Sequence, residues 1–391
     1  MISFRNKSRM LRRITVSRLC LFLAGTLLLL LWLTRWQLFH SHSGLESPSG
    51  SKHKHLLILS SWRSGSTFVG QLFNQNPSVF YLSEPAKAIW ATMSDRSHSF
   101  LQQPMRDLLK ALFLCNLSAL KPYLTRSEFV SDIYDWSSSR ALCSPPTCDK
   151  FQGLNLEAGQ ECYHVCHLTP FERAEKACLT YNHIVVKEVR FFDLKVLFPL
   201  LMDPQINLQI IHLVRDPRAI LASRPITRGL KDDNNIISES YNSTGNIYTV
   251  MKKICNAQLN IYHTAVYDLP PSLMNRYVIV RYEDLMRDPM PYVKDWYKSM
   301  GLTVFPRLLS WVRHNTHWLL PKNGASLPSS KGSAILPELW RKKLNFQKVQ
   351  IIQDMCQKEM DTFGYLKVKS EKEQLDRTLN VVLPRKDSWT E

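Results

Sequence analysis

The sequence predicts an α/β fold in which a parallel central sheet is flanked by helices, behind an N-terminal transmembrane helix. Short apolar runs at 55–61, 183–189 and 208–214 each precede a segment with helical spacing, and 276–285 has the pattern of a strand, a turn and a helix. Strands that are apolar along their whole length are typical of parallel sheets, because helices cover both faces. A third observation, an uncharged run near the N-terminus, predicts the membrane segment.

The expected elements alternate along the chain. A helix at 68–75 follows the first strand, an amphipathic helix at 191–201 follows the second, and a helix from Pro217 follows the third. The cysteine-bearing stretch 113–178 is predicted to be an insertion. Residues 53–391 are therefore expected to form a single domain.

Composition and charge restrict the class of protein. The chain has 391 residues, of which 45% are hydrophobic, and this excludes a disordered or fibrous protein. Its net charge is +17, and seven of the positive residues lie in the first 35 positions, where no acid occurs, which leaves +10 for the rest. Such a field suits an anionic partner: a nucleic acid, a phosphorylated cofactor, an acidic glycan or a membrane surface.

The uncharged run at 19–33 predicts a signal anchor. More basic residues precede the run than follow it, which favours a cytosolic N-terminus and a lumenal C-terminal part. A cleaved signal peptide is the alternative, but no small-x-small cleavage site follows Leu33. We predict a cytosolic tail at 1–13, a transmembrane helix at 14–34, a stem at 35–52 and a lumenal domain at 53–391.

The cysteines agree with an oxidising lumen. Beyond the membrane segment there are eight of them: Cys115, Cys143, Cys148, Cys162, Cys166, Cys178, Cys255 and Cys356. An even number favours disulfides, and the alternative, a zinc site that includes His164 and His167, fits no standard zinc spacing. Two sequons, at Asn116 and Asn242, predict lumenal glycosylation.

The loop after the first strand has the composition of an anion-binding site. Residues 55–72 read HLLILSSWRSGSTFVGQL, in which a strand enters a short Ser/Gly loop and then a helix. Gly65 permits a tight turn, Ser66 and Thr67 add hydroxyl donors at the helix start, and Arg63 supplies positive charge. A Walker A lysine is absent. The alternative is an ordinary turn that caps the helix.

A second candidate anion site follows the third strand. The segment HLVRDPRAILASR (212–224) places Arg215 at a strand end and Ser223 eight residues later, on the next helix. These two side chains could hold a second phosphate. The alternative is that Arg215 forms a surface ion pair with Asp216 or Glu283.

Together these motifs resemble a known family. SSWRSGSTFVGQLFNQNPSVFYLSEP, VVKEVRFF and HLVRDPRAILASR are similar to segments of the Golgi carbohydrate sulfotransferases, in particular the N-acetylglucosamine/galactose 6-O-sulfotransferase group. The resemblance runs from about residue 54 to Tyr365. It implies the sulfotransferase fold, with a P-loop-like phosphosulfate-binding loop, and 3′-phosphoadenosine 5′-phosphosulfate (PAPS) as sulfate donor, without a metal.

The resemblance also assigns the donor site. In that family the first loop binds the 5′-phosphosulfate and the second motif the 3′-phosphate. The implied cofactor-binding residues are Trp62, Arg63, Ser64, Gly65, Ser66, Thr67, Phe68, Arg215, Asp216, Pro217, Arg218, Ala219, Ile220, Leu221, Ala222 and Ser223. The chain departs from the family pattern at 226–250, at His314–His317 and at 322–341, and loops in the first of these are expected to shape acceptor choice.

Sulfuryl transfer to a sugar hydroxyl needs a base for the hydroxyl proton and a cation beside the bridging oxygen, where charge gathers as its bond to sulfur breaks. Glu84, 21 residues after Arg63, lies at the expected end of the next strand, where related enzymes place a catalytic carboxylate. We predict Glu84 as the base and Arg63 as the cation. The alternative role of Glu84 is to cap the turn made by Pro85.

Lys187 and Arg190 are predicted to bind the acceptor. They lie three residues apart in one strand and are expected to face opposite sides, so that at most one points into the site. Glu188 is an alternative base, and His212 is a weaker one that is better explained as a satisfied residue inside a strand. Two acids at a helix start are expected to be structural: Glu283 and Asp284.

The resemblance implies transfer to the 6-hydroxyl of N-acetylglucosamine, in glycoprotein glycans or keratan-type chains, at the Golgi membrane. Galactose or N-acetylgalactosamine is the alternative acceptor. Two other classes stay open: a lumenal kinase, against which the missing Walker lysine argues, and a non-catalytic binder of acidic glycans. The expected partners are glycan acceptors and, through 14–34, the membrane. Nucleic acid is not expected, and a homodimer is left open.

Overall fold

The computed structural model describes residues 53–125, 129–149, 159–224, 230–239, 246–317 and 337–384. The chain divides into two compact units, 1–50 and 51–391, and all described residues belong to the second. The predicted tail, transmembrane helix and stem lie outside them. None of the helices in the described ranges combines the length and the apolar character needed to cross a bilayer.

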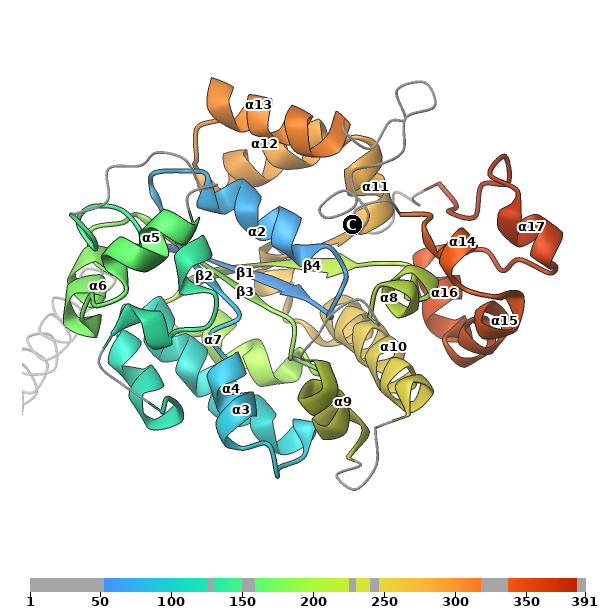
Figure 1. The fold of residues 1–391 in the computed structure, drawn as a ribbon, viewed down its shortest axis with the longest axis horizontal. Helices are drawn as coiled ribbons and strands as arrows, with labels where there is room; N and C mark the ends of the chain where they lie inside the picture. Colours follow the sequence, from blue (N-terminus) through green and yellow to red (C-terminus); the bar gives the residue numbers. More distant parts are fainter. Residues whose placement is uncertain are drawn as a thin grey trace, which may run out of the picture. The chain divides into compact units, whose positions relative to one another are not determined.

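A five-stranded parallel sheet is the centre of the described unit (Figure 1). Its strands are β1 (Lys54–Ser60), β2 (Val79–Ser83), β3 (His183–Glu188), β4 (Asn207–Val214) and β5 (Tyr277–Arg281), in the order β2-β3-β1-β4-β5. Lys54 of β1 is in register with His183 of β3 and with Asn207 of β4. The predicted parallel sheet is confirmed, and because all strands are parallel their carboxyl ends meet at one edge.

Helices connect and flank the strands. From β1 to β3 they are α2 (Ser66–Asn74), α3 (Lys87–Thr92), α4 (His98–Phe113), α5 (Gly159–Cys166) and α6 (Phe171–Cys178). From β3 to β5 they are α7 (Phe198–Leu201), α8 (Pro217–Ser223), α9 (Leu230–Ser238) and α10 (Ile247–His263). After β5 they are α11 (Tyr282–Arg287), α12 (Pro289–Met300), α13 (Pro306–His317), α14 (Trp340–Lys343), α15 (Phe346–Met355), α16 (Gln357–Phe363) and α17 (Glu371–Leu375).

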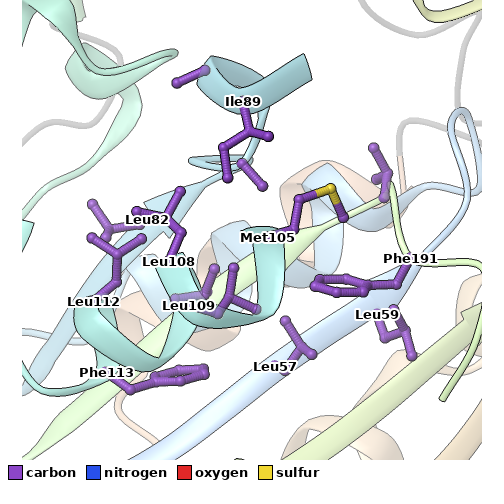
Figure 2. Close-up of a cluster of buried hydrophobic side chains, with 14 of the residues drawn as sticks. Leu57, Leu59, Leu82, Ile89, Met105, Leu108, Leu109, Leu112, Phe113 and Phe191 are labelled. Atoms are coloured by element: carbon purple, nitrogen blue, oxygen red, sulfur yellow. The ribbon is translucent and has the colours of Figure 1, made fainter. Parts of the chain in front are cut away.

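Both faces of the sheet are covered, because side chains of β1 alternate between two buried clusters. Leu57 and Leu59 pack with Leu108 and other residues of α4 (Figure 2). Leu56 and Ile58 point to the opposite face, where they pack with residues of α2, α12 and α13. Figure 1 shows α2, α12 and α13 on one side of the sheet and α3, α4 and α10 on the other.

The stretch 191–201 does not form the continuous helix that was expected. It contains a 3₁₀ turn at Lys195–Leu197 and the four-residue helix α7. Pro199 explains the break, since it lacks the N–H that a continuous helix would pair with the carbonyl of Lys195.

Four disulfides confirm the interpretation of the cysteines. Cys115–Cys178, Cys143–Cys162 and Cys148–Cys166 lie within the long crossover between β2 and β3. Cys255–Cys356 joins α10 to the residue between α15 and α16, across 101 positions of sequence. The cysteines that could have bound zinc with His164 and His167 are therefore paired with one another.

Candidate active site

The loop after β1 has an unusual backbone conformation. Arg63 and Gly65 both have positive φ, 68° and 90°. A Cβ atom on Gly65 would lie 2.2 Å from the Tyr282 ring, so only glycine fits there. A left-handed arginine is strained, and such strain is typical of functional loops. The loop then leads directly into α2, whose first N–H groups have no intrahelical acceptor and can bind an anion.

A cavity of about 510 Å³ opens beside this loop. Its lining comes from the segments that follow each of the five strands, as expected for a ligand site in an open parallel sheet. The lining residues are Trp62, Arg63, Gly65, Ser66, Thr67, Phe68, Gln71, Glu84, Lys87, Tyr134, Asp135, Lys187, Val189, Arg190, Arg215, Leu230, Asp233, Tyr282, Trp311 and Asn315. The structure thus brings the first loop, Glu84, Lys187, Arg190 and Arg215 together.

The two predicted anion-binding segments are in direct contact. Arg63 Nε donates a hydrogen bond to Ser223 Oγ at 2.9 Å, and an Arg215 Nη donates to the Arg63 carbonyl at 2.8 Å. The Arg215 guanidinium also lies over the Tyr282 ring, 4.5 Å from its centre. Burial and the charge of Arg215 lower the pKa of Arg63, while Glu84 opposes this shift. Arg215 is buried, which differs from the surface position considered as its alternative.

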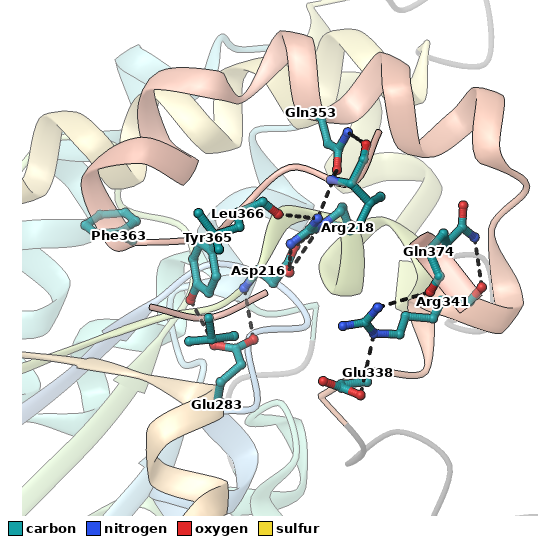
Figure 3. A network of polar contacts seen from close by, with 12 residues as sticks. Asp216, Arg218, Glu283, Glu338, Arg341, Gln353, Phe363, Tyr365, Leu366 and Gln374 are labelled. Carbon is teal, nitrogen blue, oxygen red and sulfur yellow. Dashed lines mark hydrogen bonds and ion pairs between the residues drawn. The ribbon is translucent and has the colours of Figure 1, made fainter. Parts of the chain in front are cut away.

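The middle of the second motif faces away from the cavity. Asp216 caps α8 by accepting the Arg218 N–H, and its carboxylate pairs with the Arg218 side chain at 2.7 Å (Figure 3). Arg218 donates further hydrogen bonds to Gln353 and to the Leu366 carbonyl. Of the predicted donor-site residues, Ser64 and the whole run 216–222 are buried and do not line the cavity. Arg215 lines it, and Ser223 contacts Arg63.

Glu84 is held between two cations. Its own φ is 50°, and its N–H donates to the Lys187 carbonyl at 2.7 Å. Oε1 lies 2.5 Å from Lys187 Nζ, and Oε2 lies 2.7 Å from an Arg190 Nη. Burial raises the pKa of Glu84, but Lys187 and Arg190 outweigh burial and lower it to about 2. The carboxylate is therefore ionised throughout the neutral range.

Lys187 and Arg190 both point into the site, so the prediction that they face opposite sides was wrong. The alternation of side chains holds only within a strand, and β3 ends at Glu188. Arg190 lies two residues beyond that end, outside the hydrogen-bonded strand. It contacts Asp233 of α9 at 3.2 Å, and Asp233 also accepts a hydrogen bond from Trp62 Nε1 at 2.7 Å.

The alternative bases occupy different positions. Glu188 is fully buried, does not line the cavity, and accepts a hydrogen bond from the Ala86 N–H at 2.7 Å. Burial is the main cause that raises its pKa to about 7. His212 lies inside β4 and contacts Tyr277 and Gln258. This agrees with the prediction that it is a satisfied residue inside a strand.

The two acids of the sheet-to-helix turn after β5 have structural contacts. Glu283 accepts hydrogen bonds from the Asp216 N–H and from the Tyr365 hydroxyl, and Asp284 pairs with Arg281. In the described ranges, one group has the spacing of a metal site, Cys255, Cys356 and Glu359, but its two cysteines form a disulfide.

Several residues that line the cavity were not marked as site residues by any sequence motif: Gln71, Lys87, Tyr134, Asp135, Val189, Tyr282 and Trp311. Leu230 and Asp233 fall in the stretch 226–250 that was expected to shape acceptor choice, and Asn315 falls in the segment that departs from the family pattern.

Asn116 is exposed, as a glycosylation site requires, whereas Asn242 and residues 318–336 lie outside the described residues.

Comparison with known proteins gives consistent matches. The sulfotransferase family model matches residues 56–306. Mouse carbohydrate sulfotransferase 5 is 42% identical over 346 residues, which are 87% of this chain and 88% of that protein. Human carbohydrate sulfotransferase 6 is 41% identical over 372 residues (93% and 92%), and mouse carbohydrate sulfotransferase 4 is 40% identical over 334 residues (84% and 86%).

Proposed function

Because the chain belongs to the sulfotransferase family, as one of its carbohydrate sulfotransferases, we propose that it transfers the sulfuryl group of PAPS to the 6-hydroxyl of N-acetylglucosamine. The acceptor sugar would belong to glycoprotein glycans or keratan-type chains. PAPS supplies a sulfuryl group that is already activated. The protein therefore has to bind and orient both substrates, accept a proton and stabilise charge.

One observation carries the proposal: a single cavity contains a carboxylate and several cations. Arg63 and Arg215 provide positive charge, and Ser66 and Thr67 provide hydroxyl and backbone donors at the start of α2. These donors suit the anionic groups of PAPS, and a volume of about 510 Å³ is in the usual range for a ligand site.

The residues support a single displacement at sulfur. The Glu84 carboxylate would take the proton of the acceptor hydroxyl while that oxygen forms its bond to sulfur. The bond between sulfur and the bridging oxygen breaks at the same time, and adenosine 3′,5′-bisphosphate leaves with the electron pair. Arg63, within electrostatic range of Glu84, would stabilise the charge on the leaving oxygen. Arg190 orients the base through its contact with Glu84, and Lys187 is the second cation paired with that carboxylate.

We also propose a Golgi membrane location with type II topology. The apolar run at 14–34 would be the anchor, 35–52 the stem, and 53–391 the lumenal catalytic domain. The four disulfides support an oxidising compartment. Glycosylation at Asn116 is supported by the exposure of its side chain. If the anchor is uncleaved, membrane-bound protein should keep its N-terminus and resist carbonate extraction; a mature N-terminus near residue 40 on that material would contradict this.

Two measurements test the function. Adenosine 3′,5′-bisphosphate should raise the melting temperature of the purified protein, and ATP with Mg²⁺ should not. A shift with ATP alone would indicate a kinase, and a shift with polyanions alone a non-catalytic glycan binder. Labelled PAPS and a panel of defined oligosaccharides, with the product linkage mapped, then test the acceptor. Product on the 6-position of galactose or N-acetylgalactosamine, and not on N-acetylglucosamine, would overturn the assigned sugar.

A further inference from the structure

The two cations that hold Glu84 differ in how firmly they are fixed. Arg190 donates to one carboxylate oxygen, contacts Asp233 at 3.2 Å and lies over the Trp62 ring, 5.5 Å from its centre. Its planar guanidinium is thus fixed from several directions. Lys187 reaches the other oxygen, at 2.5 Å, with a single ammonium at the end of a flexible stem. Of the two, Lys187 can turn to a different anion with less disturbance of its surroundings.

Lys187 also faces the region in which the donor is proposed to bind. It is in register with Ile58 of β1, the strand that leads into the loop with Arg63. Lys187, Arg63, Ser66 and Thr67 line the same cavity. A phosphosulfate held by this loop would bring negative charge near Lys187 and compete with Glu84 for its ammonium group.

We propose that Lys187 is exchanged between Glu84 and the donor: it pairs with Glu84 before PAPS binds, and with the sulfuryl end of PAPS afterwards. Glu84 then keeps Arg190 as its partner. This inference rests on the proposed role of Glu84 as the base. A carboxylate stabilised by two cations binds a proton weakly, so removal of one cation makes it a better base. Donor binding would therefore activate the base at the step that requires it.

Other charged and titratable groups near Glu84 stay in place during this exchange. They come from the loop after β1, from β2, from β3 and from the crossover region: Arg63, Tyr81, Glu188 and Tyr134. Arg190 and its partner Asp233 complete the surroundings. Because none of them is released from Glu84 by the exchange, a change in its proton affinity would report the departure of Lys187.

Binding measurements test the new contact without turnover. Calorimetry compares PAPS with adenosine 3′,5′-bisphosphate, which lacks the sulfuryl group, in the wild type and in Lys187→Met. Lys187→Met should weaken PAPS binding about tenfold more than bisphosphate binding, as expected for one charge-assisted contact. Lys87→Met is the matched control, because Lys87 lines the same cavity but lies over the Tyr134 ring. It should weaken both ligands equally.

The acidic limb of the kcat–pH profile is a second readout, since it reports the base in the ternary complex. If Lys187 has already left Glu84 there, Lys187→Met should not move the limb, whereas Arg190→Met should move it to higher pH. An upward shift in Lys187→Met, together with equal weakening of both ligands, would mean a permanent ion pair and overturn the proposal. Lys187→Gln repeats the comparison if the methionine variant does not fold.

The kcat of Glu84→Gln tests the assignment of Glu84 as the base independently of the contact between Lys187 and the donor. Full kcat in Glu84→Gln would remove Glu84 as the base and with it the activation step. The calorimetric comparison would then decide alone whether Lys187 binds the sulfuryl end. Equal effects of Lys187→Met on the two ligands would overturn that contact as well.

Discussion

Replacing Glu84 by glutamine removes the proposed base and keeps the size of the side chain. A positioned general base contributes roughly 10²–10⁴-fold to rate, so kcat should fall by that factor. Affinity for adenosine 3′,5′-bisphosphate should be unchanged within a few-fold, because Glu84 is assigned to the acceptor and not to the nucleotide. Steady-state kinetics at saturating PAPS and calorimetry with the bisphosphate measure the two quantities.

The same substitution should lower the stability of the protein. The contacts with Lys187 and Arg190 depress the pKa of Glu84 from 4.5 to about 2, and a shift of this size corresponds to about 3 kcal/mol of free energy of unfolding at neutral pH. Because the folded pKa is the lower one, this contribution is complete above about pH 4.5 and is lost as the pH falls toward 2. Denaturant unfolding should therefore separate wild type and Glu84→Gln at pH 7 and bring them closer in acid.

Glu188→Gln is the matched control. Glu188 is the neighbouring buried acid, yet it does not line the cavity, so kcat should stay within a few-fold of the wild-type value. A Glu84→Gln enzyme with full kcat would refute the assignment of the base. A loss of kcat that appears in Glu188→Gln and not in Glu84→Gln would transfer that role to Glu188.

Three further predictions concern the donor loop and the disulfides. Arg215→Ala should weaken bisphosphate binding about tenfold to a hundredfold, and unchanged affinity in calorimetry would remove Arg215 from the donor site. Gly65→Ala should abolish bisphosphate binding, since its Cβ would clash with Tyr282; a variant that binds normally would show that the loop tolerates a side chain. Removal of Cys255–Cys356 by a double alanine substitution should lower the free energy of unfolding by about 2–5 kcal/mol in denaturant titration, and an unchanged midpoint would contradict this.

The strands and the two anion-binding segments could be predicted from local patterns, because buried parallel strands are continuously apolar and each motif is contiguous in sequence. The cluster around Glu84 could be predicted only in part. Lys187 and Arg190 were recognised, but their common direction depends on where β3 ends, which alternation alone does not reveal. No sequence motif marked Asp233 as a site residue. It lies 43 positions from Arg190 in sequence, and the two side chains meet only because of where the fold places α9.

Asp216 and Arg218 show a second reason why site residues cannot all be predicted from sequence. Both lie inside a segment that the family resemblance assigns as a whole to the cofactor, of which Arg215 lines the cavity and Ser223 contacts Arg63. A helix presents its residues to different sides, however, and α8 turns Arg218 toward α15 and the residues after α16, while Asp216, the N-cap of α8, pairs with Arg218. The assignment implied by the resemblance covers a continuous segment, whereas in the structure Arg215 lines the cavity, Ser223 contacts Arg63, and the residues between them do neither.

The network around Arg218 also has a consequence for where this protein can be divided. The family model matches residues 56–306, but the side chain of Arg218 finds acceptors at Gln353 and Leu366, and Cys255 is bonded to Cys356. A chain cut after residue 306 would lose those acceptors, the Trp340 ring that lies over the Arg218 guanidinium, and the Cys255–Cys356 disulfide. The segment that the family model matches is thus shorter than the segment that packs around the second motif, and an exchange of parts between relatives should carry the C-terminal helices along with the donor site.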